Sequence, residues 1–211
     1  MTMPASTIDL KKTLDSYQAR HGQFRILEVP RMQYLSIDGH GDPNTSPAFT
    51  EAITALYPVA YKLKFMSKND LGRDYVVPPL EGLWWSPDMS AFTTARNKSL
   101  WDWTLMIMAP EWLSAEMVDS AKNVAARKAG SSPLVESVRL EALDEGLSVQ
   151  TLHVGSYDDE AETLAELHDV FIPSNGLVMS GTHHEIYFSD FRKVDASKLR
   201  TILRQPVARQ L

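Results

Sequence analysis

Residues Leu83-Trp84-Trp85-Ser86 return in altered form further along the chain as Ile186-Tyr187-Phe188-Ser189. A second pair of stretches, Tyr34-Leu35-Ser36-Ile37-Asp38-Gly39 and Thr151-Leu152-His153-Val154-Gly155, echo each other in the same way. In both halves the order is an apolar strand, a turn with glycine, an amphipathic helix, a strand ending in aromatics and serine, and a further apolar strand. Such a repeat predicts a duplicated strand–helix–strand–strand module. We therefore expect an α+β fold with an antiparallel sheet.

The composition is that of an ordinary globular protein. The chain has 211 residues, of which 44% are hydrophobic and 23% charged, and this length fits one large domain or two small ones. It has no cysteine, which excludes a disulfide framework, a thiolate metal site and a cysteine nucleophile. The 21 Lys and Arg against 27 Asp and Glu leave a formal charge of −6, whereas proteins that hold nucleic acid are usually basic.

The sequence shows no targeting or membrane segment. Residues 1–7 are short and polar with no apolar run behind them, and no apolar stretch approaches the roughly 18 residues of a membrane span. Roughly 23 residues precede the first expected strand, too few for a helix-turn-helix module. We expect a cytoplasmic protein that contacts neither membrane nor nucleic acid directly; the sequence identifies no protein partner.

Periodicity and turn residues place the secondary structure. Ser46 is the expected N-cap of a long helix with an apolar face from Phe49 to Leu63, and Pro58 should kink this helix or end it early. Other helices are expected over 9–18, over 114–128 and from Asp158 or Asp159 to Phe171. Strands are expected over 24–38 (interrupted at Pro30), 80–85, 100–108, 138–143, 147–154 and 184–189, with a helical turn and a final strand over 199–207.

No familiar catalytic motif is present. The chain lacks a glycine-rich phosphate loop and a Gly-x-Ser-x-Gly nucleophile elbow. His183-His184-Glu185 resembles a metal motif, but adjacent residues on a strand point to opposite sides, and two histidines one apart do not share a helical face. We therefore expect no metal site and no cofactor.

Glu185 is the most informative single residue, because it is a carboxylate inside the apolar run Ile186-Tyr187-Phe188. On a strand it shares a face with Tyr187. One interpretation is that Glu185 points to solvent or pairs with a nearby arginine such as Arg192, since exposed carboxylates are the rule. The other is a buried carboxylate that holds a cation or activates a water.

Aromatic residues form the second constellation. Tryptophans are more often core than binding site, yet Trp84 is the repeat counterpart of Tyr187, and Gly82 is the counterpart of Glu185. A small residue opposite a carboxylate, with a large aromatic beside each, leaves room for a flat ligand. Met108 is a candidate for an adaptable wall of the same site, although methionine is commonly core filler.

Several stretches together resemble the GyrI-like small-molecule-binding family, from about Ile8 to Val207. They are Asp9-Leu10-Lys11-Lys12, Ile37-Asp38-Gly39-His40-Gly41-Asp42-Pro43, Gly82-Leu83-Trp84-Trp85, His183-His184-Glu185-Ile186-Tyr187-Phe188-Ser189-Asp190 and Leu199-Arg200-Thr201-Ile202-Leu203-Arg204-Gln205-Pro206-Val207. The resemblance implies one domain over 1–211. Module one covers about 24–110 and module two about 138–207, joined by a helix over about 114–130. The modules are related by a pseudo-twofold axis, with a ligand cleft between them.

The resemblance also implies a function. In multidrug-sensing regulators with this fold, a buried glutamate and aromatics hold lipophilic cations, and Glu185 matches that glutamate by its motif position. We expect a stand-alone protein that binds small aromatic or cationic ligands in xenobiotic protection. The residues expected to bind ligand are Glu185, Tyr187, Trp84, Trp103, Met108 and Tyr157.

The alternative is a hydrolase. Some stand-alone family members are similar to enzymes that open the cyclopropane of DNA-alkylating antibiotics, and a third reading is a protein-binding gyrase inhibitor. For the hydrolase the expected catalytic residues are Glu185 as base, with Tyr157 and Tyr187. The sequence departs from the family pattern at Pro58, at Ser156, where proline is common, and at Phe191, where proline is usual.

Overall fold

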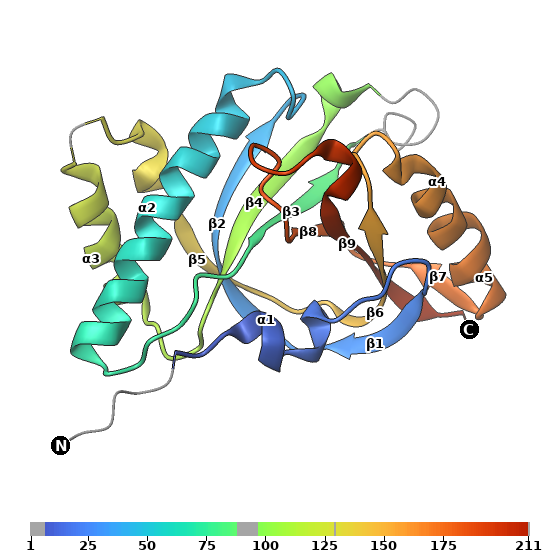
Figure 1. Ribbon diagram of the computed structural model, residues 1–211, viewed down its shortest axis with the longest axis horizontal. Helices are drawn as coiled ribbons and strands as arrows, with labels where there is room; N and C mark the ends of the chain where they lie inside the picture. The colour runs from blue at the N-terminus through green and yellow to red at the C-terminus, as the bar shows by residue number, and fades with distance from the viewer. Residues whose placement is uncertain (1–6, 88–96, 129, 211) are drawn as a thin grey trace. The chain divides into compact units, whose positions relative to one another are not determined.

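The structure is a computed structural model that describes residues 7–87, 97–128 and 130–210 (Figure 1). The fold is α+β, as the repeat predicts, and every ladder between the described strands given below is antiparallel. The chain divides into two units. Unit 1 comprises Met1–Thr13, Met32–Pro78 and Trp85–Leu143, and unit 2 comprises Leu14–Arg31, Pro79–Trp84 and Asp144–Leu211.

Unit 1 contains a three-stranded ladder covered by helices. The strand order is β4-β2-β5, and helix α2 contacts β2, β4 and helix α3. Short helical turns complete the unit. The bounds are α1 Leu10–Thr13, β2 Met32–His40, α2 Pro47–Asp70, η3 Lys98–Leu100, β4 Asp102–Ala109, α3 Ala115–Ala126, η4 Pro133–Ser137 and β5 Arg139–Leu143.

Helix α2 corrects one expectation. It runs for 24 residues and continues well past Pro58, so the expected early end at this proline is wrong. Pro58 is exposed, and the opposite side of the helix buries apolar residues on both sides of the proline. Each buried aliphatic side chain contributes roughly 1.5–3 kcal/mol, which offsets the backbone bond that proline removes. The buried residues are Ala52, Ala55, Leu56, Val59, Ala60, Leu63 and Ser67.

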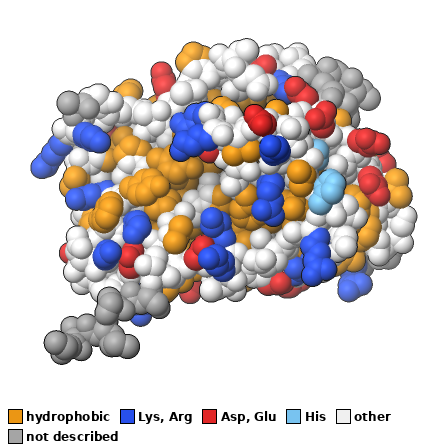
Figure 2. All heavy atoms as spheres, viewed as in Figure 1, with side chains coloured by type: hydrophobic (Ala, Val, Ile, Leu, Met, Phe, Trp, Pro, Cys, Tyr) orange, Lys and Arg blue, Asp and Glu red, His pale blue; other side chains and the backbone are white. Residues whose placement is uncertain are grey.

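The helix starts agree better with the sequence. Ser46 occupies the N-cap position of α2 with Pro47 in the first turn, although its side chain makes no capping hydrogen bond. The solvent side of α2 carries Tyr61 and Phe65, each about half exposed. Figure 2 shows hydrophobic side chains gathered over this helix with Lys and Arg around them.

Unit 2 contains a five-stranded ladder in the order β1-β6-β9-β8-β3, with β7 paired to β9. A helical segment of α4, a π-helical stretch η5 and α5 lies beside β7 (Figure 1). Val149, Leu167, Ile172, Leu177 and Val207 pack together and join this segment to the sheet. The bounds are η1 Asp15–Tyr17, β1 Arg25–Val29, β3 Leu80–Trp85, β6 Gly146–Val154, α4 Glu160–Ala165, η5 Glu166–Phe171, α5 Ile172–Ser174, β7 Leu177–Met179, β8 His183–Tyr187, η6 Ala196–Lys198 and β9 Arg200–Arg209.

The strand expected over 24–38 is interrupted near Pro30, where the chain passes from unit 2 to unit 1. Strand β1 ends at Val29 and pairs with β6 in unit 2, and β2 begins at Met32 and pairs with β4 and β5 in unit 1. Strand β3 has the bounds that the sequence predicts, whereas the short strand β7 was not expected. Among the described residues, no helix combines the length and apolar character needed to cross a membrane.

Candidate functional site

The register of the unit 2 sheet sorts its side chains into two faces. Glu185 is paired with Gly82 on β3 and Leu203 on β9, and Leu203 is paired in turn with Thr151 on β6. Because alternate residues of a strand share a face, the cross-strand rows two residues before and two residues after Glu185 lie on the same side of the sheet as Glu185. We call this side the Glu185 face; it carries Leu80, Tyr187, Thr201 and His153 in one flanking row, and Trp84 with His183 in the other.

A chain of hydrogen bonds joins three residues of this face. Trp84 Nε1 donates to the hydroxyl oxygen of Tyr187 over 2.9 Å, and the Tyr187 hydroxyl donates to Glu185 Oε2 over 2.6 Å. Gly82 leaves the space for this chain: a Cβ there would lie 2.9 Å from Trp84 Nε1 and 3.3 Å from the Tyr187 hydroxyl. The sequence predicts that Gly82, Glu185, Trp84 and Tyr187 belong to one group, and the structure brings them together.

Tyr157 adds a second ring beside Tyr187. The two rings meet edge to face, with centroids 5.7 Å apart. Burial is the main cause that raises the pKa of each tyrosine above its ordinary value, and the negative charge of Glu185 raises both further. Both hydroxyls therefore stay protonated at neutral pH, the form in which a phenol can donate a hydrogen bond.

Two histidines lie on the other side of Glu185: His183 is next to the carboxylate, and His168 is next to His183. His183 Nε2 lies 3.5 Å from Glu185 Oε1, with side-chain exposures of 10% and 14% respectively. The ring of His168, from η5, meets the His183 ring edge-on with centroids 5.9 Å apart. Burial, and then the proximity of His183, lowers the pKa of His168 to about 4. His168 is therefore neutral at physiological pH.

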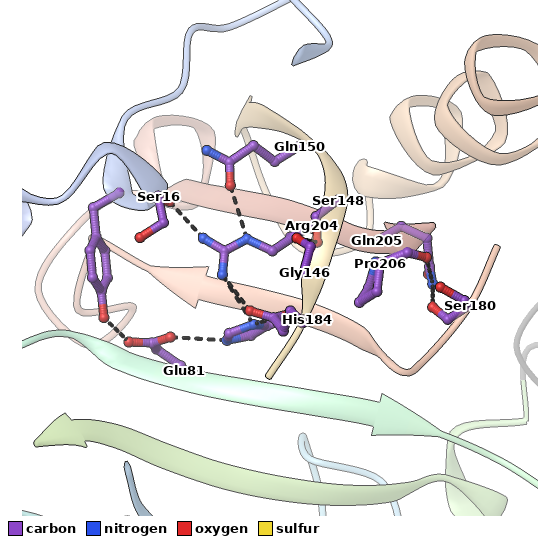
Figure 3. A network of polar contacts seen from close by, with 12 residues as sticks. Ser16, Glu81, Gly146, Ser148, Gln150, Ser180, His184, Arg204, Gln205 and Pro206 are labelled. Carbon is purple, nitrogen blue, oxygen red and sulfur yellow. Dashed lines mark hydrogen bonds and ion pairs between the residues drawn. The ribbon is translucent and has the colours of Figure 1, made fainter. Parts of the chain in front are cut away.

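The opposite face of the same strands holds a buried charge network (Figure 3). His184, next to Glu185 in the chain, places Nδ1 2.9 Å from Glu145 Oε1 and Nε2 2.9 Å from Glu81 Oε2. Arg204 donates to Glu145 Oε2 over 2.7 Å, to Gln150 Oε1 over 2.9 Å and to the carbonyl of Ser16 over 2.6 Å. The hydroxyl of Tyr17 donates to Glu81.

This network shifts the pKa values of His184 and Glu145. Despite burial, the two carboxylates raise the pKa of His184 to about 9. The charges of His184 and Arg204 lower the pKa of Glu145 to about 2 against the opposing effect of burial. Two buried cations thus face two carboxylates, and paired charges are the form in which a fold tolerates such burial.

The other candidate ligand-binding residues, Trp103 and Met108, lie on β4 in unit 1. Trp103 is fully buried: its ring covers Gly39, where an added Cβ would overlap the indole, and it meets Phe49 edge-on at 5.3 Å. Its Nε1 donates to the carbonyl of Gly41 over 3.2 Å. Met108 is 5% exposed and pairs with Tyr34 of β2. The contacts described for both residues lie within unit 1.

The sequence names Arg192 as a candidate partner of Glu185. In the structure Arg192 donates from Nε to Asp190 Oδ1 over 2.8 Å and from Nη2 to Asp190 Oδ2 over 2.9 Å. Sequence reasoning missed His183 as a neighbour of Glu185 and His168 as a neighbour of His183, and it missed Glu81 entirely. A signal for Glu81 exists, because it too is a carboxylate inside an apolar strand. The described residues contain no group of three or more His, Asp or Glu side chains arranged to hold a metal ion.

The fold and this site define a class of protein: an α+β domain in which a carboxylate lies among aromatic and histidine side chains. The chain belongs to the family described as GyrI-like small molecule binding domain, whose model matches residues 22–208. No curated protein matches the chain.

Solved structures agree with this assignment. An uncharacterised conserved protein from Listeria innocua is 36% identical with a TM-score of 0.86, and a protein from the same organism titled a hydrolase is 36% identical with a TM-score of 0.82. Each comparison covers 96% of this chain and 100% of the other. The C-terminal domain of EcmrR is 14% identical with a TM-score of 0.54, over 89% of this chain and 98% of that one, and shares the fold.

Proposed function

We propose that unit 2 binds flat lipophilic compounds, and cations in preference to others, at Glu185. The observation that carries this proposal is the Glu185 carboxylate itself. It is only 14% exposed, and one of its oxygens accepts from Tyr187, whose ring meets that of Tyr157. Membership of a small-molecule-binding family supports the assignment.

The charges around the site favour a cation. On the opposite face, Glu81 and Glu145 are matched by His184 and Arg204, so that network leaves the charge of Glu185 uncancelled. A positive ring close to this carboxylate gains a Coulomb attraction in a partly dry environment. Contact with the faces of aromatic side chains adds roughly 0.5–2 kcal/mol.

Trp84 is a supporting wall of this site. It is 5% exposed, and its indole N–H holds the Tyr187 hydroxyl. Trp84→Ala therefore removes both ring area and the donor that orients Tyr187. Trp84→Phe removes the donor and keeps most of the ring area, so the two variants separate the effects. Trp103 and Met108 are also proposed to contact the ligand, and both lie in unit 1.

The test uses two isosteric probes that differ in charge, 1-methylquinolinium and 1-methylnaphthalene. Titrations followed by fluorescence should give tighter binding of the cation, by roughly three- to thirtyfold from the cation–π range. Glu185→Gln should reduce the preference, because the amide matches the carboxylate in shape but is uncharged, and the preference that remains measures the contribution of the aromatic rings. Trp84→Ala should weaken both probes. Equal affinities that Trp84→Ala leaves unchanged would refute a site at this position.

A second candidate function is hydrolysis of a conjugated cyclopropane. It is favoured by the Glu185–Tyr187 pair and by the 36% identity to a protein titled a hydrolase. In the proposed step Glu185 takes a proton from water while the water oxygen bonds to a cyclopropane carbon. The ring C–C bond breaks, and its electron pair passes to the conjugated carbonyl oxygen. Tyr157 donates a hydrogen bond to that oxygen, and the oxygen finally receives the proton from Glu185.

Mass spectrometry of the protein incubated with a cyclopropanoid alkylator tests this second function. Ring-opened product in molar excess over protein supports catalysis. A stoichiometric complex without released product supports the binding function alone.

A further inference from the structure

His183 is a residue of the Glu185 face whose polar side-chain atoms are unsatisfied. Its side chain is 10% exposed. Within the part of the chain that the structure describes, neither of its ring nitrogens has a hydrogen-bond partner. Buried polar atoms are nearly always hydrogen-bonded, and leaving one unpaired carries its full desolvation cost. A buried ring with two unsatisfied nitrogens beside a ligand-binding carboxylate therefore requires an explanation.

The position of Glu185 distinguishes the two nitrogens. Nε2 of His183 is the one that lies 3.5 Å from Glu185 Oε1, and a carboxylate only accepts hydrogen bonds. When the ring carries one proton, that proton is most stable on Nε2, facing the carboxylate. Nδ1 then presents a bare lone pair and can only accept a hydrogen bond.

The groups around His183 do not repel a cationic ligand. Trp84 is its cross-strand neighbour on β3, and the His168 ring meets it edge-on. His168 is neutral at physiological pH because burial lowers its pKa to about 4. Of the side chains described here as facing His183, only Glu185 is charged, and its negative charge attracts a cation.

We propose that His183 Nδ1 is a specificity-determining acceptor of the site, and that the preferred ligands are flat aromatic compounds carrying an N–H or O–H donor. This inference rests on the proposed binding function and adds the chemical class of the ligand. The aromatic body is placed at Trp84, Tyr157 and Tyr187, and the donor group is placed at His183. A compound of the same shape without a donor leaves Nδ1 unpaired and binds more weakly.

The experiment compares permanent cations that differ only in a donor: the 6- and 7-amino-1-methylquinolinium isomers and their 6- and 7-methyl counterparts. Wild-type protein should bind at least one amino compound about five- to tenfold more tightly than its methyl partner, the net effect of one hydrogen bond. His183→Phe should remove this preference. Trp84→Leu, the matched control, should weaken both members of a pair and keep their ratio.

A second measurement does not depend on a variant that folds. In wild-type protein labelled with ¹⁵N-histidine, binding of the amino compound should move the Nδ1 resonance of His183 away from its free-acceptor position, and the methyl compound should not. Equal affinities within each pair, with no movement of that resonance, would overturn the role of His183 and leave the binding function standing. Failure of every quinolinium to bind would overturn both.

Discussion

Glu81 and Glu185 are both carboxylates inside strands of unit 2, and their surroundings differ. Glu81 is fully buried and faces His184 and Tyr17. Glu185 is partly exposed, and its hydrogen-bonding neighbour is Tyr187. His184 and Tyr17 hold Glu81 in place, whereas Glu185 is the carboxylate at which a ligand or a water is proposed to bind. A shift of one residue in the register of β3 and β8 thus separates the buried Glu81 from Glu185, the carboxylate proposed to bind ligand.

Substitution of Glu185 separates binding from catalysis. Glu185→Gln keeps the shape and can still accept from Tyr187, but it cannot take a proton from water. If the protein is a hydrolase, turnover should fall by about 10²- to 10⁴-fold, the usual contribution of a positioned base, with near-native affinity for a neutral substrate. Steady-state kinetics and a binding titration check both halves. Wild-type turnover in this variant would exclude Glu185 as the base.

The sequence predicts the residues of the site better than their partners. An acidic residue within an apolar strand marks Glu185, and the alternation of a strand places Tyr187 beside it. Pattern cannot reveal that His168 meets His183, because their contact depends on how the η5 segment packs on the sheet. Trp103 and Trp84 look alike in sequence, yet Trp103 is in unit 1 under Phe49 and Trp84 hydrogen-bonds to Tyr187.

Helix α2 shows the same limit at the scale of an element. Its apolar spacing and its start at Ser46 and Pro47 are readable in the sequence, and local rules place a break at Pro58. The helix continues because residues on both sides of Pro58 are buried. Propensity acts locally, whereas burial is summed over the whole helix face, and here the sum is larger.

Replacing this proline should stabilise the protein. Pro58 is exposed, so Pro58→Ala loses little packing and restores a backbone donor inside the helix. We expect a gain of roughly 1–3 kcal/mol in the free energy of unfolding, allowing for the greater freedom of the unfolded chain. Urea unfolding measures this, with the exposed Glu51→Ala as a control that should change little. A loss of stability in Pro58→Ala would show that the helix has adapted its packing to the proline.

The stability of the whole molecule should depend on pH through the buried network. The pKa of His184 is raised to about 9, so its contribution is complete below its unfolded pKa near 6.5 and is lost as pH rises through 9. The pKa of Glu145 is lowered to about 2, so its contribution is present above about 4.5 and is lost as pH falls through 2.

Unfolding free energies measured from pH 6 to 9.5 should therefore decline toward the alkaline end, by an amount on the order of 3 kcal/mol for His184. His184→Gln should be less stable and should lack this alkaline decline. Parallel pH profiles for the two proteins would contradict the assignment. Ring NMR signals that show His184 neutral at pH 7 in the wild type would contradict it independently of the variant.

The chain changes unit five times, after residues 13, 31, 78, 84 and 143. Neither unit is therefore a continuous piece of sequence, and neither can be obtained by cutting the chain once. Because the chain passes repeatedly between the units, we expect the protein to unfold in one cooperative transition rather than one unit at a time.

Strand β9 follows β6 and β8 in the chain but lies between them in the sheet. During synthesis on a ribosome, Glu185 therefore emerges before residues 200–209, the neighbours that hold its strand against β6. Until residues 200–209 arrive, Glu185 lacks its β9 partner Leu203, and Glu145 lacks Arg204, one of its two buried counter-charges. Under the proposed function, ligand binding therefore requires the synthesis of β9, and a chain truncated before residue 200 is expected not to bind.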